Sequence, residues 1–184
     1  MQNRRWFRRW EIGVELIRQC KAFDSYFNDA DHVDVKTIET DTDLRSFISG
    51  MLSYNPWWLV TLYRIREIFV RILGLVHHEQ PDVLLSIRPD NLSFTPGEKA
   101  SFFIVRDAEE DKYWVSESPE DKHLRAFLGV VEERLNQNDR RYHVFTCVTY
   151  LHWTGPVYFN LIRPFHHLVL RSMMKAGIRN HRLP

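Results

Sequence analysis

The sequence predicts an α+β protein in which an antiparallel sheet wraps around a long C-terminal helix. The helix is predicted over Gly155–Gly177, where apolar residues recur at steps of three and four and form one apolar face. Pro156 suits its first helical position, and Gly177 suits the residue beyond its end. Pro164, inside the same pattern, predicts a bend. The sheet is predicted because several β-rich runs precede this helix, of which Tyr142–Trp153 is the longest.

Composition bounds the class of protein. A chain of 184 residues that is 44% hydrophobic and 27% charged is typical of one globular domain, and a net charge of +1 gives no overall field that favours nucleic acid. Cys20 and Cys147 are too few for a disulfide framework and match no metal-binding spacing. No run of about 18 apolar residues predicts a membrane span, and no signal peptide is recognisable. We therefore expect a cytoplasmic protein without a metal or cofactor.

The first 22 residues are predicted to be a basic and aromatic extension ahead of a single domain over residues 23–184. Arginine and aromatic side chains are interleaved in it: Arg4, Arg5, Trp6, Phe7, Arg8, Arg9 and Trp10. Such a mixture can contact a membrane surface, phosphates or a protein partner. The more ordinary interpretation is that the rings pack on the domain and the arginines stay in water, so no nucleic acid is expected. Ile12–Phe23 continues the extension as a predicted helix.

The first half of the domain is predicted to be one strand followed by two helices. Ser25–Asp31 has the composition of a loop, and His32–Glu39 alternates apolar with polar residues, which indicates a half-buried strand. Thr40–Asp43 supplies turn and N-cap residues for a short helix over Leu44–Tyr54. A second helix is predicted over Pro56–Gly74, with proline at its start and glycine at its end.

The second half is predicted to be rich in strands. These are Val83–Ile87, Ala100–Arg106, Tyr113–Ser116 and Tyr142–Trp153. Pro96-Gly97 is a turn signal before the second of them. His123–Leu135 is ambiguous, because Ser118–Asp121 is typical of a helix start and the apolar residues that follow keep helical spacing. Local rules alone therefore favour a helix there.

Several short phrases support a more specific interpretation. They are Asp29-Ala30-Asp31, Asn55-Pro56-Trp57-Trp58, Arg64-Ile65-Arg66 with Gly74-Leu75, Asp121-Lys122-His123-Leu124-Arg125, and Pro156-Val157-Tyr158 with Pro164-Phe165-His166. In their order and spacing, the chain resembles a bacterial domain family of unknown function of the START/Bet v 1-like (SRPBCC, helix-grip) type. The resemblance covers roughly Phe23–Gly177 and does not explain the basic extension.

The resemblance implies a helix-grip fold, in which a curved antiparallel sheet wraps around the C-terminal helix and two short helices follow the first strand. It also implies that His123–Leu135 is a strand, and we adopt the strand because neighbours in a sheet can override local preference. Members of the family can follow an NAD-binding domain, but this sequence has no G-x-G-x-x-G fingerprint. Because the family has no settled activity, the resemblance predicts a shape and no mechanism.

No catalytic motif is recognisable, so neither a catalytic residue nor a reaction is predicted. The sequence has no H-E-x-x-H, C-x-x-C, P-loop or G-x-S-x-G pattern. His166 and His167 are neighbours on the predicted helix and point about 100° apart, so they cannot share a metal ion. One is expected to face the sheet and the other the rim or solvent.

The residues that could line a cavity beneath the helix are Trp57, Tyr150, Tyr158, Phe165, His166 and Met173. We expect Tyr158 or His166 to orient a ligand by a hydrogen bond, and Phe165 and Met173 to supply contact area. Phe165 is also expected to lie in the core. For the tyrosines and the histidine, bonds to nearby backbone and ordinary core positions remain the simpler interpretation.

Two functions fit these observations. The first is binding of a small apolar or amphipathic ligand between the sheet and the C-terminal helix. The second is a non-catalytic interaction or structural module whose interior is filled with side chains. A cavity above about 300 Å³ favours the binder, whereas a filled interior with an exposed aromatic patch favours the module.

Overall fold

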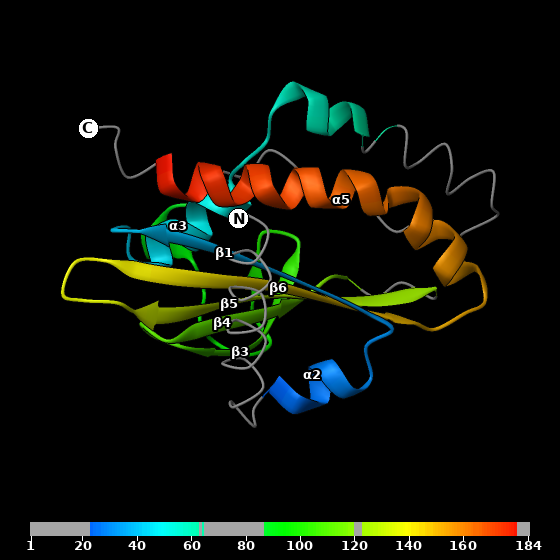
Figure 1. Ribbon diagram of the computed structural model, residues 1–184, viewed down its shortest axis with the longest axis horizontal. Coiled ribbons are helices and arrows are strands. Elements are labelled where there is room, and N and C mark those ends of the chain that lie inside the picture. Colours follow the sequence, from blue (N-terminus) through cyan, green and yellow to red (C-terminus); the bar gives the residue numbers. More distant parts are fainter. Residues whose placement is uncertain (1–22, 63, 65–86, 120–122, 180–184) are drawn as a thin grey trace, which may run out of the picture.

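The computed structural model describes residues 23–62, 64, 87–119 and 123–179, and it arranges them as one sheet with helices on both faces (Figure 1). In chain order the elements are α2 (Asp24–Asn28), β1 (His32–Thr40), α3 (Leu44–Leu52), the 3-10 turn η2 (Pro89–Asn91), β2 (Lys99–Ala100), β3 (Phe103–Glu109), β4 (Tyr113–Glu117), β5 (Leu124–Arg134), β6 (Arg140–Tyr150) and α5 (Thr154–Arg179). Residues 57–62 are also helical. The predicted α+β class is confirmed.

In the described part of the chain, the sheet has six antiparallel strands in the order β1-β6-β5-β4-β3-β2. β5 and β6 form a long hairpin, from Leu124 opposite Tyr150 to Arg134 opposite Arg140. The first strand, β1, pairs with the last, β6. The strand that the resemblance implied for His123–Leu135 is β5 and is confirmed. Helical spacing does not prevail there because β4 and β6 bond to β5 on its two sides.

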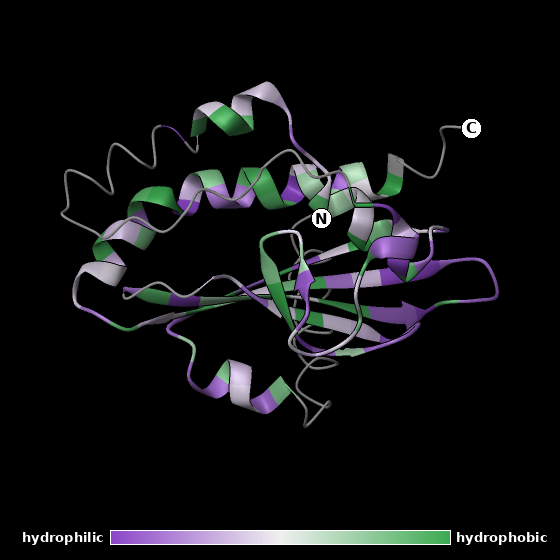
Figure 2. Cartoon of the chain, turned by 180° about the vertical axis from the view of Figure 1, so that it is seen from behind, coloured by the Kyte–Doolittle hydropathy of each residue, from purple (hydrophilic) through white to green (hydrophobic). Residues whose placement is uncertain are grey.

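Different helices cover the two faces of the sheet. α5 crosses one face as a single helix that bends in its N-terminal part, α3 lies against it, and α2 lies on the opposite face (Figure 1). On the α5 face the buried core includes Phe47, Trp114, Leu128, Val130, Tyr142, Val144, Leu170 and Met174. On the α2 face it comprises Phe23, Val35, Val115, Val131, Phe145 and Cys147. Hydrophobic and hydrophilic residues alternate along α5, so only part of this helix contributes to the core (Figure 2).

α3 and α5 cross so closely that a glycine of each lies at the contact. A Cβ on Gly50 would lie 2.8 Å from the Cα of Gly177, and a Cβ on Gly177 would lie 2.6 Å from the carbonyl oxygen of Phe47. The prediction that Gly177 follows the helix end is therefore wrong. α5 continues to Arg179, and the missing side chain at Gly177 permits the close approach of the two helices.

Three other boundaries differ from prediction. Ser25–Asp31, predicted as a loop, contains the short helix α2. Ala100–Arg106 is not one strand, because Ser101 adopts a left-handed φ of 59° and turns the chain between β2 and β3. β6 begins before the predicted strand and ends at Tyr150, and α5 begins at Thr154.

Several predictions fall on residues that the structure does not describe. They are the N-terminal extension with its predicted helix up to residue 22, most of the strand Val83–Ile87, and the part of the helix Pro56–Gly74 beyond residue 64. Among the helices that are described, none has both the length and the apolar character needed to cross a membrane.

Candidate functional site

Alternate residues of β1 present polar side chains to α5. Successive side chains of a strand point to opposite faces, so His32, Asp34 and Lys36 share the α5 face, whereas Val33 and Val35 share the α2 face. The valines pack in the core beside α2. The alternation therefore predicted the strand correctly, but its polar face lies beneath α5 rather than in solvent.

Asp34 and Lys36 form an ion pair that is largely removed from water, with side chains 15% and 12% exposed. His167 of α5 joins them, because its Nδ1 lies 3.1 Å from Asp34 Oδ2 and 3.1 Å from Lys36 Nζ. Burial by itself would raise the pKa of Asp34, but the hydrogen bond and charge of Lys36, followed by His167, outweigh burial and lower this pKa. Asp34 is therefore a carboxylate at neutral pH, held by an ammonium group and close to an imidazole.

His166, the neighbour of His167, faces the interior. Its Nε2 lies 3.2 Å from the hydroxyl oxygen of Thr146, which points towards α5 from β6. Burial lowers the pKa of His166 to about 4, although the Asp34 carboxylate acts in the opposite direction. The ring is therefore neutral at physiological pH and offers one donor and one acceptor.

His32 adds a third imidazole to this face. Its ring packs on Phe159 of α5, with 4.8 Å between ring centroids. Burial lowers the pKa of His32, and the charge of Arg163 acts in the same direction, so this ring is also neutral. Within the described part of the chain, its buried Nε2 has no hydrogen-bond partner. Buried polar atoms without a partner are uncommon in native proteins, so this nitrogen is a candidate contact for a ligand.

These residues form the helix-side cluster, which consists of His32, Asp34, Lys36, Thr146, His166 and His167. The cluster can hold a polar group by hydrogen bonds. Among the residues that the structure describes, no group of three His, Cys, Asp or Glu side chains is placed to hold a metal ion. Cys147 lies on the opposite face of the sheet, and burial raises the pKa of its thiol to about 12. A thiol in this state is a poor nucleophile.

Residues 24–173 match the model of the DUF2867 family, whose members are proteins of unknown function. The chain belongs to this family. No match was found among curated proteins.

Several solved structures share an outline with this DUF2867 chain. A START superfamily protein from Mycobacterium smegmatis is 12% identical, with a TM-score of 0.41 over 81% of this chain and 98% of that one. Norcoclaurine synthase from Thalictrum flavum is 11% identical, with a TM-score of 0.42 over 83% of this chain and 87% of that one. A hypothetical protein from Helicobacter pylori is 9% identical, with a TM-score of 0.40 over 82% and 88% of the two chains.

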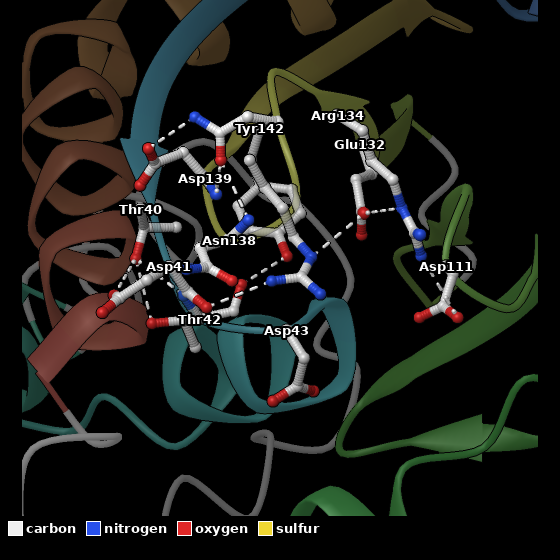
Figure 3. Close-up of polar contacts among 12 residues, drawn as sticks. Thr40, Asp41, Thr42, Asp43, Asp111, Glu132, Arg134, Asn138, Asp139 and Tyr142 are labelled. Atoms are coloured by element: carbon white, nitrogen blue, oxygen red, sulfur yellow. Dashed lines mark hydrogen bonds and ion pairs between the residues drawn. The ribbon is translucent and has the colours of Figure 1, made fainter.

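A second cluster of polar residues lies where β1 leads into α3 and β5 turns into β6 (Figure 3). This end cluster consists of Asp41, Thr42, Glu132, Arg134, Arg140 and Tyr142. Glu132, whose side chain is fully buried, accepts hydrogen bonds on Oε1 from Arg134 (3.1 Å) and Arg140 (3.2 Å). Arg140 also donates to the carbonyl oxygen of Asp41, and Tyr142 donates to that of Thr42 at 2.7 Å. These bonds join the hairpin to the start of α3, which supports a structural role for the end cluster. Oε2 of Glu132 is, like Nε2 of His32, a buried atom without a hydrogen-bond partner among the described residues.

A depression of about 360 Å³ lies on the opposite face of the sheet, between α2 and strands β5 and β6. It is lined by Ser25, Tyr26, Asp29, Arg125, Phe127 and Thr149. Two of its polar groups already have partners, because Thr149 donates to the Asp29 carbonyl oxygen at 2.9 Å and Arg125 lies 3.3 Å from the Glu117 carboxylate. This depression is therefore a weaker candidate than the helix-side cluster.

The structure separates the residues that the sequence proposed for a cavity. His166 belongs to the helix-side cluster, and Met173 is partly buried against the core of the α5 face. Tyr158 is buried, whereas Trp57 is 81% exposed. The rings of Tyr150 and Phe159 have their centroids 6.0 Å apart.

Phe165 lies on the outer side of α5 and is 48% exposed, so the prediction that it belongs to the core is wrong. Its helix carries apolar residues on two sides. The sequence spacing could not show which side faces the sheet, because this depends on the packing of α5 rather than on periodicity.

Sequence analysis missed most of the helix-side cluster. Asp34, Lys36 and Thr146 carry no motif, and charged residues that alternate along a strand ordinarily face water. Their burial depends on α5, which is far away in the sequence. The one available signal was the pair His166 and His167, because two neighbouring histidines on an apolar helix indicate polar partners beneath it.

Proposed function

We propose that this DUF2867 protein binds a small amphipathic ligand between the sheet and α5, with the polar group of the ligand at the helix-side cluster. The buried Asp34–Lys36 pair is the observation that carries the proposal. Replacing a buried ion pair with well-packed apolar residues is often neutral or stabilises a protein by about 1–4 kcal/mol. Stability alone therefore does not explain this pair, and buried groups with shifted pKa values are concentrated at functional sites.

Apolar side chains adjoin the cluster and could contact the body of such a ligand. Val144 and Val148 lie directly opposite Lys36 and His32 in the register of β1 with β6, so they share the α5 face. Phe159 contacts both His32 and His166, with ring centroids 4.8 and 6.3 Å apart. A few polar groups within an apolar lining are typical of ligand sites, in which the polar groups fix the orientation of the ligand.

Binding of Nile red, an uncharged dye whose emission depends on its surroundings, tests the proposal. The native protein should bind the dye. Met173→Trp, which adds bulk on the inner side of α5, should reduce binding at least tenfold, and His166→Leu should change the emission of the bound dye. Leu168→Trp adds similar bulk on the outer side, where Leu168 is 53% exposed, and should leave binding unchanged. No binding by the native protein would refute the proposal.

An interaction module is the second candidate, and the outer side of α5 favours it. Exposed apolar residues recur there at steps of three and four: Val157, Leu161, Phe165 and Leu168. Apolar side chains grouped on one exposed surface are typical of interaction sites. If Leu168→Trp rather than Met173→Trp alters dye binding, then the dye occupies this outer surface and the interaction module becomes the better explanation.

A further inference from the structure

We infer that the polar group of the ligand is uncharged, and that it is a hydroxyl or carbonyl group rather than a carboxylate or an amine. This inference rests on the proposed function and narrows it to a class of ligand. It follows from the balance of charge beneath α5 and from the hydrogen bonds that the helix-side cluster has already formed.

The buried charges of the cluster cancel. Asp34 supplies one negative charge and Lys36 one positive charge, and the two are in direct contact. The rings of His32 and His166 are neutral because burial lowers the pKa of each. A charged ligand group would lose its hydration on entering this site and would find no unbalanced opposite charge.

The elements around the cluster also carry charges of both signs. Arg163 of α5 is exposed, and its positive charge acts on His32 and on Tyr150. The carboxylate of Asp31 acts on Tyr150 as well and accepts a hydrogen bond from its backbone N–H at 2.6 Å. Neither sign of charge therefore dominates the surroundings of the cluster.

The hydrogen bonds within the cluster leave donors available. The Lys36 ammonium donates to Asp34 Oδ2, and its Nζ lies 3.1 Å from His167 Nδ1. Nδ1 of His167 either accepts from Lys36 or, when it carries the proton, donates to Asp34 Oδ2 at 3.1 Å. Lys36 has three N–H groups, and the structure records two partners for them among the described residues. The buried Nε2 of His32 can also donate, so an oxygen that accepts hydrogen bonds suits the site.

Three naphthalene derivatives with the same apolar body test the inference. They are 2-naphthalenemethanol, 2-naphthoate and 2-naphthylmethylamine, which carry a hydroxyl, a negative charge and a positive charge at pH 7.5. Their dissociation constants for the native protein are measured by displacement of Nile red and by calorimetry. We expect the alcohol to bind at least about tenfold more tightly than either ion, because only the ions must bring an unbalanced charge into the site.

Two variants that remove one charge of the Asp34–Lys36 pair should change the order of affinity for the three compounds in opposite directions. Asp34→Asn leaves the Lys36 charge unopposed and should shift the preference towards 2-naphthoate by about tenfold. Lys36→Gln leaves the Asp34 charge unopposed and should shift it towards the amine by a similar factor. Glu109→Gln and Lys112→Gln are matched controls, because they neutralise a pair that is 50% and 65% exposed. Neither control should change the order.

The outcomes separate the inference from the function on which it rests. If either ion binds the native protein as tightly as the alcohol does, or if Nile red binds and the alcohol does not, the inference is wrong while the binding site stands. If the native protein binds neither Nile red nor any of the three compounds, the proposed function fails and the inference fails with it. Circular dichroism checks that each variant is folded. If a charge variant unfolds, the order of the three compounds on the native protein decides the question.

Discussion

Both faces of the sheet bury an apolar cluster, but they differ in how their buried polar side chains are paired, although the same strands supply both. On the α2 face, β6 contributes Phe145 and Cys147, and Phe145 contacts the rings of Phe23 and Phe27. On the α5 face the same strand contributes Thr146, which meets His166. Both faces therefore bury apolar side chains, and they differ in their polar groups. On the α2 face, the buried Glu117 and His143 pair with the more exposed Arg106 and Glu133. On the α5 face, both members of the Asp34–Lys36 pair are at most 15% exposed, and His167 of α5 joins them.

This difference indicates which face is specialised. Apolar packing accounts for most of the α2 face, and its buried Glu117 and His143 have the partners Arg106 and Glu133, which remain 42% and 26% exposed. The α5 face departs from that pattern at β1, where Asp34 and Lys36 occupy positions that apolar side chains could fill. Departures from local consistency concentrate at functional sites, so this pair supports the proposed site beneath α5 more directly than the overall fold does.

Truncation of Phe145, in the core of the α2 face, and of Phe165, on the outer side of α5, should give the largest difference in stability. Phe145 is fully buried on the α2 face, so Phe145→Ala should lower the free energy of unfolding by about 3–5 kcal/mol. Phe165, on the outer side of α5, is 48% exposed, and Phe165→Ala should cost less than about 1 kcal/mol. Urea denaturation of both variants measures these values. Equal losses would contradict the assignment of the two rings.

Acid should weaken the α5 face through His166. Its pKa is about 4 in the folded protein and 6.5 in the unfolded chain, so between these pH values the unfolded chain binds the additional proton. The stability from this group is therefore complete above about pH 6.5 and is lost progressively as the pH falls towards 4, by roughly 2–4 kcal/mol. Urea midpoints across this range should fall less steeply in His166→Gln than in the native protein. The pKa values of His32 and His143 are also lowered, but both residues are present in the native protein and in His166→Gln. They therefore do not contribute to the difference in slope between the two proteins.

Local pattern and pairing determined how much of the fold could be predicted. The N-cap of α3 depends on neighbouring residues, because Asp43 accepts a hydrogen bond from the Ser46 N–H at 2.9 Å. The alternation of β1 is also local, and both α3 and β1 were predicted. β5 has helical spacing and becomes a strand only because two other strands bond to it. The burial of Asp34 is likewise decided by a helix distant in sequence. Elements with local causes were therefore predictable from the residues alone, β5 was predicted from the family resemblance, and most of the site was not predicted.

Breaking the Asp34–Lys36 pair should have a smaller effect than truncating Phe145. Lys36→Met leaves the Asp34 carboxylate beneath α5 without its ammonium partner, which should cost about 2 kcal/mol because both side chains retain some exposure. The double variant Asp34→Leu/Lys36→Met removes both charges and should recover native stability or exceed it. Thermal and urea denaturation measure both. A double variant less stable than the native protein would show that the pair stabilises the fold and would remove the main support for a functional interpretation.

A small effect is expected where α2 is attached to the sheet. The Thr149 hydroxyl of β6 donates to the carbonyl oxygen of Asp29, just beyond the end of α2, at 2.9 Å. Thr149→Val removes this bond with little change of shape and should cost about 0.5–1.5 kcal/mol. Thr149→Ser retains the hydroxyl and should stay close to the native value. Because the bond anchors one short helix, amide hydrogen exchange should increase mainly over α2 and hardly at all in β6. Uniform exchange across both elements would show that α2 and the sheet open as one unit, and the two faces would then not be separable in stability.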